Sequence, residues 1–149
     1  MPSIAVNPDL IDEDYLHVVA AIMFAEGRLL IAQRQKGKHL QDYWEFPGGK
    51  REAGETAWQA LQRELDEEIR IWPTRGKPFM RVYYRYPDRN ILLDCWQVDA
   101  WRGTVSPGEK QRLCWIDLEH IDDYRYPPAD IPVIDAIKNN AIAGTRRSP

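Results

Sequence analysis

The sequence predicts an α+β domain, an α/β/α sandwich in which helices cover both faces of a central mixed sheet. Three observations lead to this prediction. Residues 56–72 contain neither Gly nor Pro and carry apolar side chains at helical spacing. Apolar runs typical of strands lie on both sides of this helix. A second helical pattern begins at residue 131.

Length and composition indicate one domain of ordinary size. The 149 residues are 44% hydrophobic and 29% charged, values that are typical of a soluble globular protein. No repeat, low-complexity tract or linker divides the chain. We therefore expect a single domain over residues 15–142, an N-terminal extension over 1–14 and a flexible tail over 143–149.

Charge and hydropathy argue against several classes of partner. The net charge of −3 argues against a nucleic-acid groove, which needs a basic surface. No run reaches the ~18 apolar residues of a membrane span, and the N-terminus lacks a basic segment followed by an apolar run. The sequence therefore predicts a cytoplasmic protein, expected to be a monomer, that binds neither nucleic acid nor membrane.

The first strands are predicted to form a hairpin. Residues 16–24 form an apolar, β-branched run that is too continuous for a strand with one solvated face, so we expect a central strand. Glu26-Gly27 supplies the turn, and residues 28–34 form the returning strand. A polar loop follows. The segment that Gly48-Gly49 opens is expected to have no regular structure.

The helix that follows has a predicted start and a predicted buried face. Thr56 with Gln59 three residues later matches a capping box, which places the first turn there. Four apolar residues then fall on one side of the helical wheel: Trp58, Leu61, Leu65 and Ile69. We expect this stripe to be buried.

Three acidic residues lie beside that stripe at the i, i+3 and i+4 spacing: Glu64, Glu67 and Glu68. Like charges at this spacing destabilise a helix by a few tenths of a kcal/mol per pair unless a cation lies among them. Carboxylate oxygens are the ligands that hard cations such as Mg²⁺ prefer. An acidic run on a helix is more often a solvated face, so these three residues alone leave both interpretations open.

The rest of the chain is predicted to be mainly strands. The predicted elements are strands at 79–86, 91–101 and 112–116, a helical turn at 117–121 and a last helix at 131–141 with Val133, Ile134 and Ile137 inward. A turn at 87–90 joins the first two strands. Cys95 and Cys114 both lie in strand patterns, and we expect small buried hydrophobic residues without a disulfide.

The helix and the segment before it together carry a longer pattern. The order G-x5-E-x7-R-E-U-x-E-E-x-G-U, in which U is aliphatic, is the signature of the Nudix hydrolases, and this chain resembles them at eight of the nine positions. The matching residues are Gly49, Glu55, Arg63, Glu64, Leu65, Glu67, Glu68 and Ile71. Arg70 stands where the family has Gly. Either a non-glycine residue ends the helix in the left-handed conformation, at a cost of about 1 kcal/mol, or the helix ends in another way.

Residues 16–134 also resemble the MutT subgroup of that family, the small nucleoside-triphosphate pyrophosphohydrolases that cleanse the nucleotide pool. The resemblance implies a Nudix fold and a cation, Mg²⁺ with Mn²⁺ as a substitute, held by the Gly48 carbonyl, Glu64, Glu67, Glu68 and Glu109. It implies a nucleotide site made of Arg34, His39, Glu45, Phe46, Arg89 and Asp130. Arg63 is expected to support catalysis by pairing with Glu55. Taken alone, Arg34, His39 and Arg89 would each be ordinary surface residues.

The resemblance implies attack of water at the β-phosphorus, which releases a nucleoside monophosphate and pyrophosphate. Either Glu64 or Glu109 would deprotonate the water, and the sequence leaves that choice open. The mutator-preventing members carry Asn where this chain has Asp130, and an ionised carboxylate cannot donate the hydrogen bond that an amide donates. Burial would raise the pKa of Asp130 and make a protonated, Asn-like form available.

Two substrate classes remain, oxidised purines such as 8-oxo-dGTP, and CTP or a 5-substituted dCTP. We favour 8-oxo-dGTP because Arg34, His39, Arg89 and the lead-in E-F-P-G-G follow the mutator-preventing pattern closely. An alternative of another class is a nucleotide-binding regulator that has lost catalysis. Degenerate members usually lose an acid of the signature, and none is missing here.

Overall fold

The computed structural model describes residues 13–38, 40–108 and 111–147. Its sheet contains β1 (Leu16–Ala25), β2 (Arg28–Gln33), β3 (Trp44–Glu45), β4 (Gly48–Lys50), β5 (Trp72–Tyr86), β6 (Arg89–Arg102) and β7 (Leu113–Asp117). The helices are α1 (Ala57–Ile69), α2 (Ile131–Arg147) and the 3-10 helices η1 (Leu118–Asp123) and η2 (Pro128–Asp130). Within the described residues, no helix is long and apolar enough to cross a membrane.

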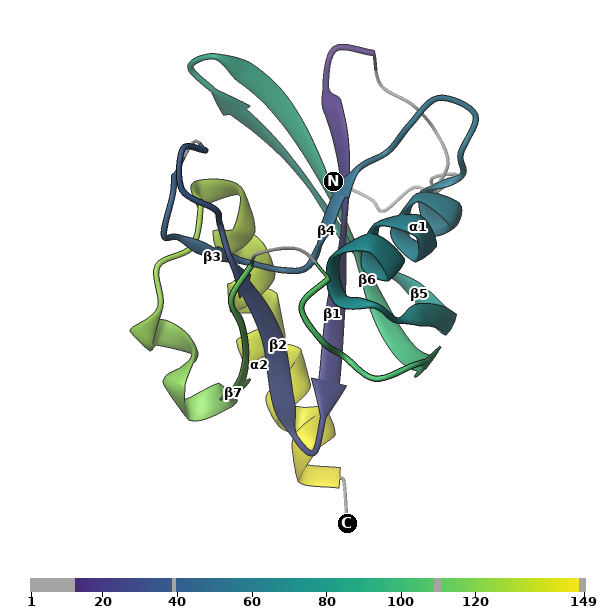
Figure 1. Cartoon of the computed structure of the whole chain (residues 1–149). Helices are drawn as coiled ribbons and strands as arrows, with labels where there is room; N and C mark the ends of the chain where they lie inside the picture. The colour runs from purple at the N-terminus through teal and green to yellow at the C-terminus, as the bar shows by residue number, and fades with distance from the viewer. Residues whose placement is uncertain (1–12, 39, 109–110, 148–149) are drawn as a thin grey trace, which may run out of the picture.

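The sheet is mixed, as predicted. Its main path runs β3-β2-β1-β6-β5, with β7 on β2 and β4 on β1. β1 and β6 are parallel, and the other strand pairs are antiparallel. Figure 1 shows α1 against β5 and β6 on one side, and α2 running behind β2. The predicted α/β/α sandwich is therefore confirmed.

β1 carries two cores, because its alternate residues point to opposite faces. The core on the α1 face contains Val19, Ala21 and Met23 of β1 with Leu61, Leu65 and Ile69 of α1. The core on the α2 face contains Ala20 and Ile22 with Val133, Ile134 and Ile137 of α2, which are buried as predicted. Trp58 is an exception to the predicted stripe: it is only partly buried and packs at the edge of the core, its ring 5.5 Å from that of Trp96.

β1 and β2 separate soon after their turn, and this separation makes room for the site. They pair at Phe24 opposite Leu29 and at Ala25 opposite Arg28, whereas residues 18–20 of β1 pair with β4. The N–H of Ala21 donates to the carbonyl of Pro47 at 2.8 Å, which ties the segment between β3 and β4 into the opening.

The prediction that Gly48 and Gly49 lie in a segment without regular structure is wrong. They belong to β4, opposite Ala20 and Val19 of β1. A Cβ atom on Gly48 would collide with the backbone carbonyl of Val19. The glycine is therefore needed because two backbones approach closely. In the sequence, a glycine needed for this reason cannot be told from a glycine in a loop.

The start of α1 follows the prediction, and its end takes one of the two forms that the sequence left open. The capping box is present: Thr56 Oγ1 accepts from the Gln59 N–H at 3.1 Å, and Gln59 Oε1 accepts from the Thr56 N–H at 2.9 Å. At the other end Arg70 takes the left-handed conformation, with φ 61° and ψ 37°. The carbonyl of Glu68 accepts from the N–H of Gly108 at 2.8 Å, so the loop after β6 packs against the end of the helix.

Several element limits differ from prediction. β5 begins at Trp72 rather than at residue 79, although Pro73 and Pro78 interrupt the pattern. It is the edge strand and has register shifts near both prolines, which is how an edge tolerates a missing N–H. β2 ends at Gln33, the hairpin turn shrinks to Pro87-Asp88, and α2 continues to Arg147. Cys95 is buried and Cys114 only partly so, and both thiols are free.

Candidate active site

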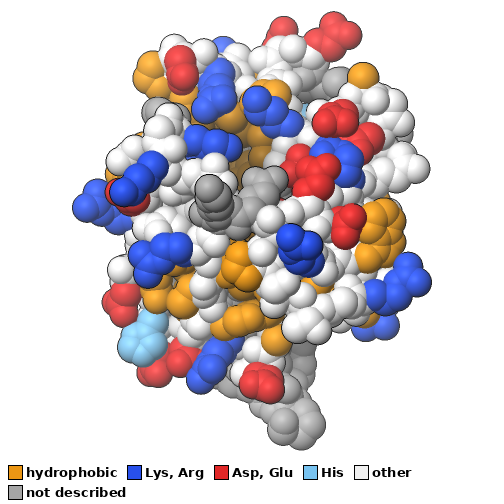
Figure 2. Space-filling view, viewed as in Figure 1, with side chains coloured by type: hydrophobic (Ala, Val, Ile, Leu, Met, Phe, Trp, Pro, Cys, Tyr) orange, Lys and Arg blue, Asp and Glu red, His pale blue; other side chains and the backbone are white. Residues whose placement is uncertain are grey.

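A cavity of about 460 Å³ opens between α1, β4 and η2, a volume typical of small-molecule sites. It is lined by nine of the predicted site residues: Arg34, Glu45, Phe46, Gly48, Glu64, Glu67, Glu68, Arg89 and Asp130. Figure 2 shows Asp and Glu gathered over α1 and Lys and Arg gathered on the side of β3. One wall is thus acidic and the other basic.

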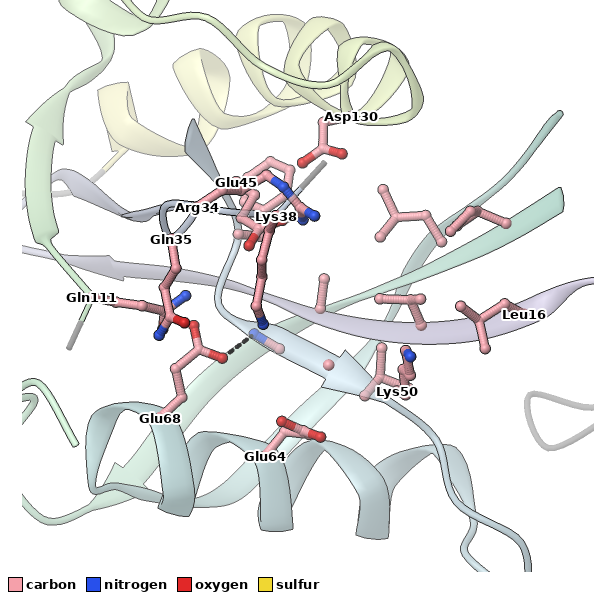
Figure 3. Close-up of a pocket in the computed structure, with 18 of the residues that line it drawn as sticks. Leu16, Arg34, Gln35, Lys38, Glu45, Lys50, Glu64, Glu68, Gln111 and Asp130 are labelled. Carbon is pink, nitrogen blue, oxygen red and sulfur yellow. Dashed lines mark hydrogen bonds and ion pairs between the residues drawn. The ribbon is translucent and has the colours of Figure 1, made fainter. Parts of the chain in front are cut away.

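The acidic wall is α1. Figure 3 shows Glu64 and Glu68 rising from the helix toward β4. The Glu68 carboxylate accepts a hydrogen bond from the N–H of Gly48 at 3.3 Å, and the residue is only 6% exposed. Glu64 accepts from Arg63 Nη1 at 3.0 Å, and a carboxylate oxygen of Glu67 lies 3.6 Å from the same nitrogen. Arg63 therefore offsets part of the repulsion between the acids.

The predicted pairing of Arg63 with Glu55 is present. Arg63 Nε donates to Glu55 Oε2 at 2.6 Å, and Nη2 donates to Glu55 Oε1 at 2.9 Å. This bidentate geometry is the strongest form of carboxylate pairing, and it lowers the pKa of Glu55. Nη2 also donates to the Lys50 carbonyl at 3.0 Å. Arg63 does not line the cavity. Its bonds to Lys50, Glu55 and Glu64 join β4, the loop after β4 and α1.

The residues of this wall fit a divalent cation. The Glu64, Glu67 and Glu68 carboxylates and the Gly48 carbonyl are hard oxygen donors of the kind that Mg²⁺ and Ca²⁺ take. A Cβ atom on Gly49 would collide with the carboxyl group of Glu64, so the missing side chain leaves that carboxylate its place beside β4. The proposed cation site thus combines the carboxylates of α1 with a backbone segment, Gly48-Gly49, that has no side chains.

The opposite wall carries a second pair of carboxyl groups. Figure 3 shows Asp130 across the cavity from α1, above Glu45 and Arg34. Arg34 Nη1 donates to Glu45 Oε1 at 2.7 Å. Burial raises the pKa of Glu45, and Arg34 opposes this.

Asp130 is more strongly affected. Burial, and after it the charge of Glu45, raises the pKa of Asp130 well above its usual range; Arg34 and the Phe46 backbone oppose the shift. Asp130 is only 6% exposed. Asp130 is buried and Glu45 is partly buried, and the Arg34 guanidinium faces both carboxyl groups. The raised pKa favours the protonated form of Asp130, which can donate a hydrogen bond into the cavity.

A smaller pocket of about 90 Å³ adjoins the cavity at this wall and shares Arg34, Glu45 and Asp130 with it. Apolar and aromatic residues dominate it: Val18, Leu40, Tyr86, Ile91, Leu93, Pro127 and Ala129. Tyr86 Oη accepts from the N–H of Ala129 at 3.0 Å, which holds η2 against β5. A mainly apolar pocket with the carboxyl groups of Glu45 and Asp130 and two arginines in its lining suits a flat heterocycle with polar edges.

Two predicted residues, His39 and Glu109, lie outside the described residues. Sequence reasoning also missed five polar residues of the cavity: Gln35, Lys38, Lys50, Glu52 and Gln111. Lys38 reaches in with its ammonium toward β4 (Figure 3). Gln111 Oε1 is buried, and among the described residues it has no hydrogen-bond partner. The sequence indicated only a polar loop around Lys38, and nothing in that pattern showed that this lysine faces the cavity.

A different cluster brings three possible metal ligands within 4.8 Å of one another among the described residues: Asp117, Glu119 and His120. All three are exposed, and none lines the cavity. Asp117 pairs with Arg28 at 3.1 Å, and His120 lies 3.0 Å from Asp123. Their neighbours account for this cluster as ordinary surface ion pairs.

The chain is similar to known proteins along most of its length. A model described as NUDIX domain matches residues 18–136. The 8-oxo-dGTP diphosphatase of Escherichia coli K12 is 38% identical over 120 residues, 80% of this chain and 93% of the relative. The CTP pyrophosphohydrolase of the same organism is 40% identical over 121 residues, 81% of this chain and 90% of the relative.

Solved structures show the same relationship. A MutT structure, from work on the Aliivibrio salmonicida and Vibrio cholerae proteins, superposes with a TM-score of 0.73 at 34% identity. That match covers 84% of this chain and 98% of the other. The Escherichia coli ORF135 protein gives a TM-score of 0.76 at 37% identity and covers 91% and 96% of the two chains.

Proposed function

Since the chain belongs to the NUDIX domain family, we propose that this Nudix hydrolase is a nucleoside-triphosphate pyrophosphohydrolase that prefers 8-oxo-dGTP and so cleanses the nucleotide pool. The observation that carries the base preference is Asp130, a buried carboxyl group whose pKa is raised by burial and which lines a mainly apolar pocket across the cavity from the acids of α1. We also propose that the enzyme works in the cytoplasm as a monomer on free nucleotides.

The acidic wall would hold the cation, for which we propose Mg²⁺, with Mn²⁺ as a substitute. Glu64, Glu67, Glu68 and the Gly48 carbonyl supply its ligands, with Glu109 as a further one. Such a cation neutralises phosphoryl oxygens and lowers the pKa of water. Arg63 keeps the Glu64 carboxylate in place through the bond at 3.0 Å. Glu64 or Glu109 takes the proton of the attacking water at a carboxylate oxygen.

The basic wall would place the rest of the nucleotide. Arg34, Lys38 and Arg89 line the same cavity as the acids and bring positive charge to a polyanion. A protonated Asp130 can donate to O6 of 8-oxoguanine and accept from the N7–H that only the oxidised base carries. Unmodified guanine has a bare N7 and cannot satisfy the accepting oxygen. A buried polar group left unpaired costs about 1–3 kcal/mol, enough for selection against dGTP.

A second substrate class has its own support. The relative named CTP pyrophosphohydrolase is as similar to this chain as the 8-oxo-dGTP diphosphatase. An ionised Asp130 could accept a hydrogen bond from the exocyclic amine of cytosine. The protonation state of Asp130 therefore separates the two substrates, and its burial favours the oxidised purine.

The test compares kcat/KM for 8-oxo-dGTP, dGTP, CTP and 5-methyl-dCTP in the parent and in Asp130→Asn, with pyrophosphate release followed in Mg²⁺. We expect 8-oxo-dGTP to lead dGTP by at least about tenfold, equivalent to roughly 1.4 kcal/mol. Asp130→Asn should keep or widen that lead, because an amide donates and accepts as the protonated acid does. A parent enzyme that prefers CTP over every purine would refute the proposed substrate.

A further inference from the structure

A buried polar cluster lies outside the cavity, on the α1 face of the sheet. It contains His17 of β1, Asp94 of β6 and Arg81 of β5. His17 Nε2 lies 2.8 Å from Asp94 Oδ2, and Arg81 Nη2 donates to the same oxygen at 3.3 Å. His17 is 6% exposed and Asp94 1% exposed. Neither residue lines the cavity, so the catalytic site does not explain why the core contains them.

Arg51, in the loop between β4 and α1, connects this cluster to the loop. Its backbone N–H donates to the His17 carbonyl at 3.0 Å, and its Nη1 lies 3.3 Å from His17 Nδ1. A guanidinium can only donate, so Nδ1 of His17 must accept, and the ring proton sits on Nε2. That proton is donated to Asp94. The direction of the whole chain of bonds is thereby fixed.

The chain of bonds continues to the acidic wall. Arg51 Nε donates to the Glu55 carbonyl at 2.7 Å. The Glu55 carboxylate receives both bonds from Arg63, and it also accepts from the Glu52 N–H at 2.9 Å. Arg63 in turn bonds Glu64. Asp94, in the middle of the sheet, is thus connected through His17, Arg51, Glu55 and Arg63 to a carboxylate of the proposed cation site.

We propose that His17 and Arg51 are positioning residues. They anchor the loop of residues 51–56 to the sheet and, through Glu55 and Arg63, fix where Glu64 and Glu67 point. The inference rests on the proposed function, because it concerns the same site. Residues 52–54 are exposed, so apolar burial does not hold this loop. An anchor made of directed hydrogen bonds fixes both its position and its orientation.

Two variants of His17 separate anchoring from simple packing. A Gln side chain places its amide where Nε2 lies, so His17→Gln keeps a donor for Asp94 and loses the acceptor for Arg51. An Asn side chain places its amide where Nδ1 lies, so His17→Asn keeps the acceptor for Arg51 and leaves Asp94 without its histidine. Arg51→Met removes the guanidinium at similar volume, and Arg51→Lys restores one of the two side-chain bonds. Arg28→Met, an exposed arginine that pairs with Asp117, is the matched control.

The first readout is amide hydrogen exchange at Glu52 and Glu55 in the protein without metal or substrate. In Arg51→Met and His17→Gln we expect protection to fall, and the Mg²⁺ concentration for half-maximal activity to rise about tenfold, as for other residues that orient metal ligands. KM for the nucleotide at saturating Mg²⁺ should stay unchanged. Arg51→Lys should recover part of the loss. His17→Asn should keep the amide protection and lower Tm.

Parent-like exchange and parent-like Mg²⁺ dependence in Arg51→Met and His17→Gln would overturn the proposal. Equal loss of protection in Arg28→Met would do the same. An inactive parent would refute the proposed function while the exchange measurement, which needs no substrate, still decides on the anchor.

Discussion

The backbone N–H of Gly48 donates to the carboxylate of Glu68 across 3.3 Å, which joins β4 to α1 at the floor of the cavity. The bond fixes one oxygen of a buried acid against a glycine whose Cβ position the Val19 carbonyl fills. An acid held in this way contributes its charge at one place, as a cation ligand must.

Glu68→Gln and Glu67→Gln should each lower turnover by at least about 10² while the fold stays intact, because each change removes a charge without removing volume. Turnover with Mg²⁺ is the measurement, and circular dichroism and Tm report the fold. Asp66→Asn, on the exposed side of α1, is the control and should keep parent turnover. Near-normal rates in both glutamine variants would show that this face of α1 is not the cation site.

Asp130 should make stability depend on pH. Its pKa in the folded protein lies well above the usual 3.8. Above pH 3.8 the unfolded chain has lost this proton and the folded protein still holds it, so the free energy of unfolding falls as pH rises toward the folded pKa. Asp130→Asn removes that decline. We expect its Tm at neutral pH to exceed that of the parent by about 3 °C or more, the shift from about 1 kcal/mol in a domain of this size.

The measurement is Tm as a function of pH for the parent, for Asp130→Asn and for Asp135→Asn. Asp135 is an exposed residue of α2, and its replacement controls for the loss of one charge. A parent and an Asp130→Asn variant with parallel Tm profiles above pH 4 would contradict a protonated Asp130 in the folded protein.

Arg70→Gly should stabilise the protein. Arg70 has φ 61° and ψ 37°, a conformation that costs a residue with a Cβ atom about 1 kcal/mol and costs glycine little. The gain should appear as a Tm rise of roughly 3 °C with unchanged turnover. Arg70→Ala keeps the Cβ atom and serves as the control. An equal rise in Arg70→Ala would attribute the effect to the lost charge.

Much of this site could be predicted, because its parts are local in sequence. The capping box at Thr56 and the acids of α1 follow from spacings within one helix, and the Arg63–Glu55 pair follows from the family motif that spans this helix and the segment before it. The limits of β5 could not be predicted, because its prolines are tolerated only on an edge, and edge position depends on the whole sheet. Trp58 was predicted to be buried because the helical wheel shows which side of the helix it lies on, but not where the opposing sheet ends.

The contacts of His17 with Asp94 and with Arg51 could not have been found from the sequence. These residues are separated by up to 77 residues, and each alone resembles an ordinary strand or loop residue. The parallel pairing of β1 and β6 and the antiparallel pairing of β4 with β1 bring them together. Contacts of this kind depend on register, which local patterns do not specify.

Lys38→Met should weaken substrate binding more than it slows turnover. The Lys38 side chain lines the cavity and reaches toward β4 without a hydrogen bond or ion pair to another described residue. Its charge acts on the nearby Glu45 carboxylate without a close ion pair. A cation beside a polyanion site attracts phosphate oxygens in the ground state and in the transition state alike, and loss of such uniform binding raises KM with little change in kcat. We expect KM to rise about fivefold, equivalent to roughly 1 kcal/mol, and the effect to shrink as salt screens the charge.

Lys36→Met is the matched control, because Lys36 is exposed in the same loop and does not line the cavity. Steady-state kinetics at low and high ionic strength decide the matter: equal changes in the two variants would mean that the net charge of the loop, and not the place of Lys38, sets the affinity.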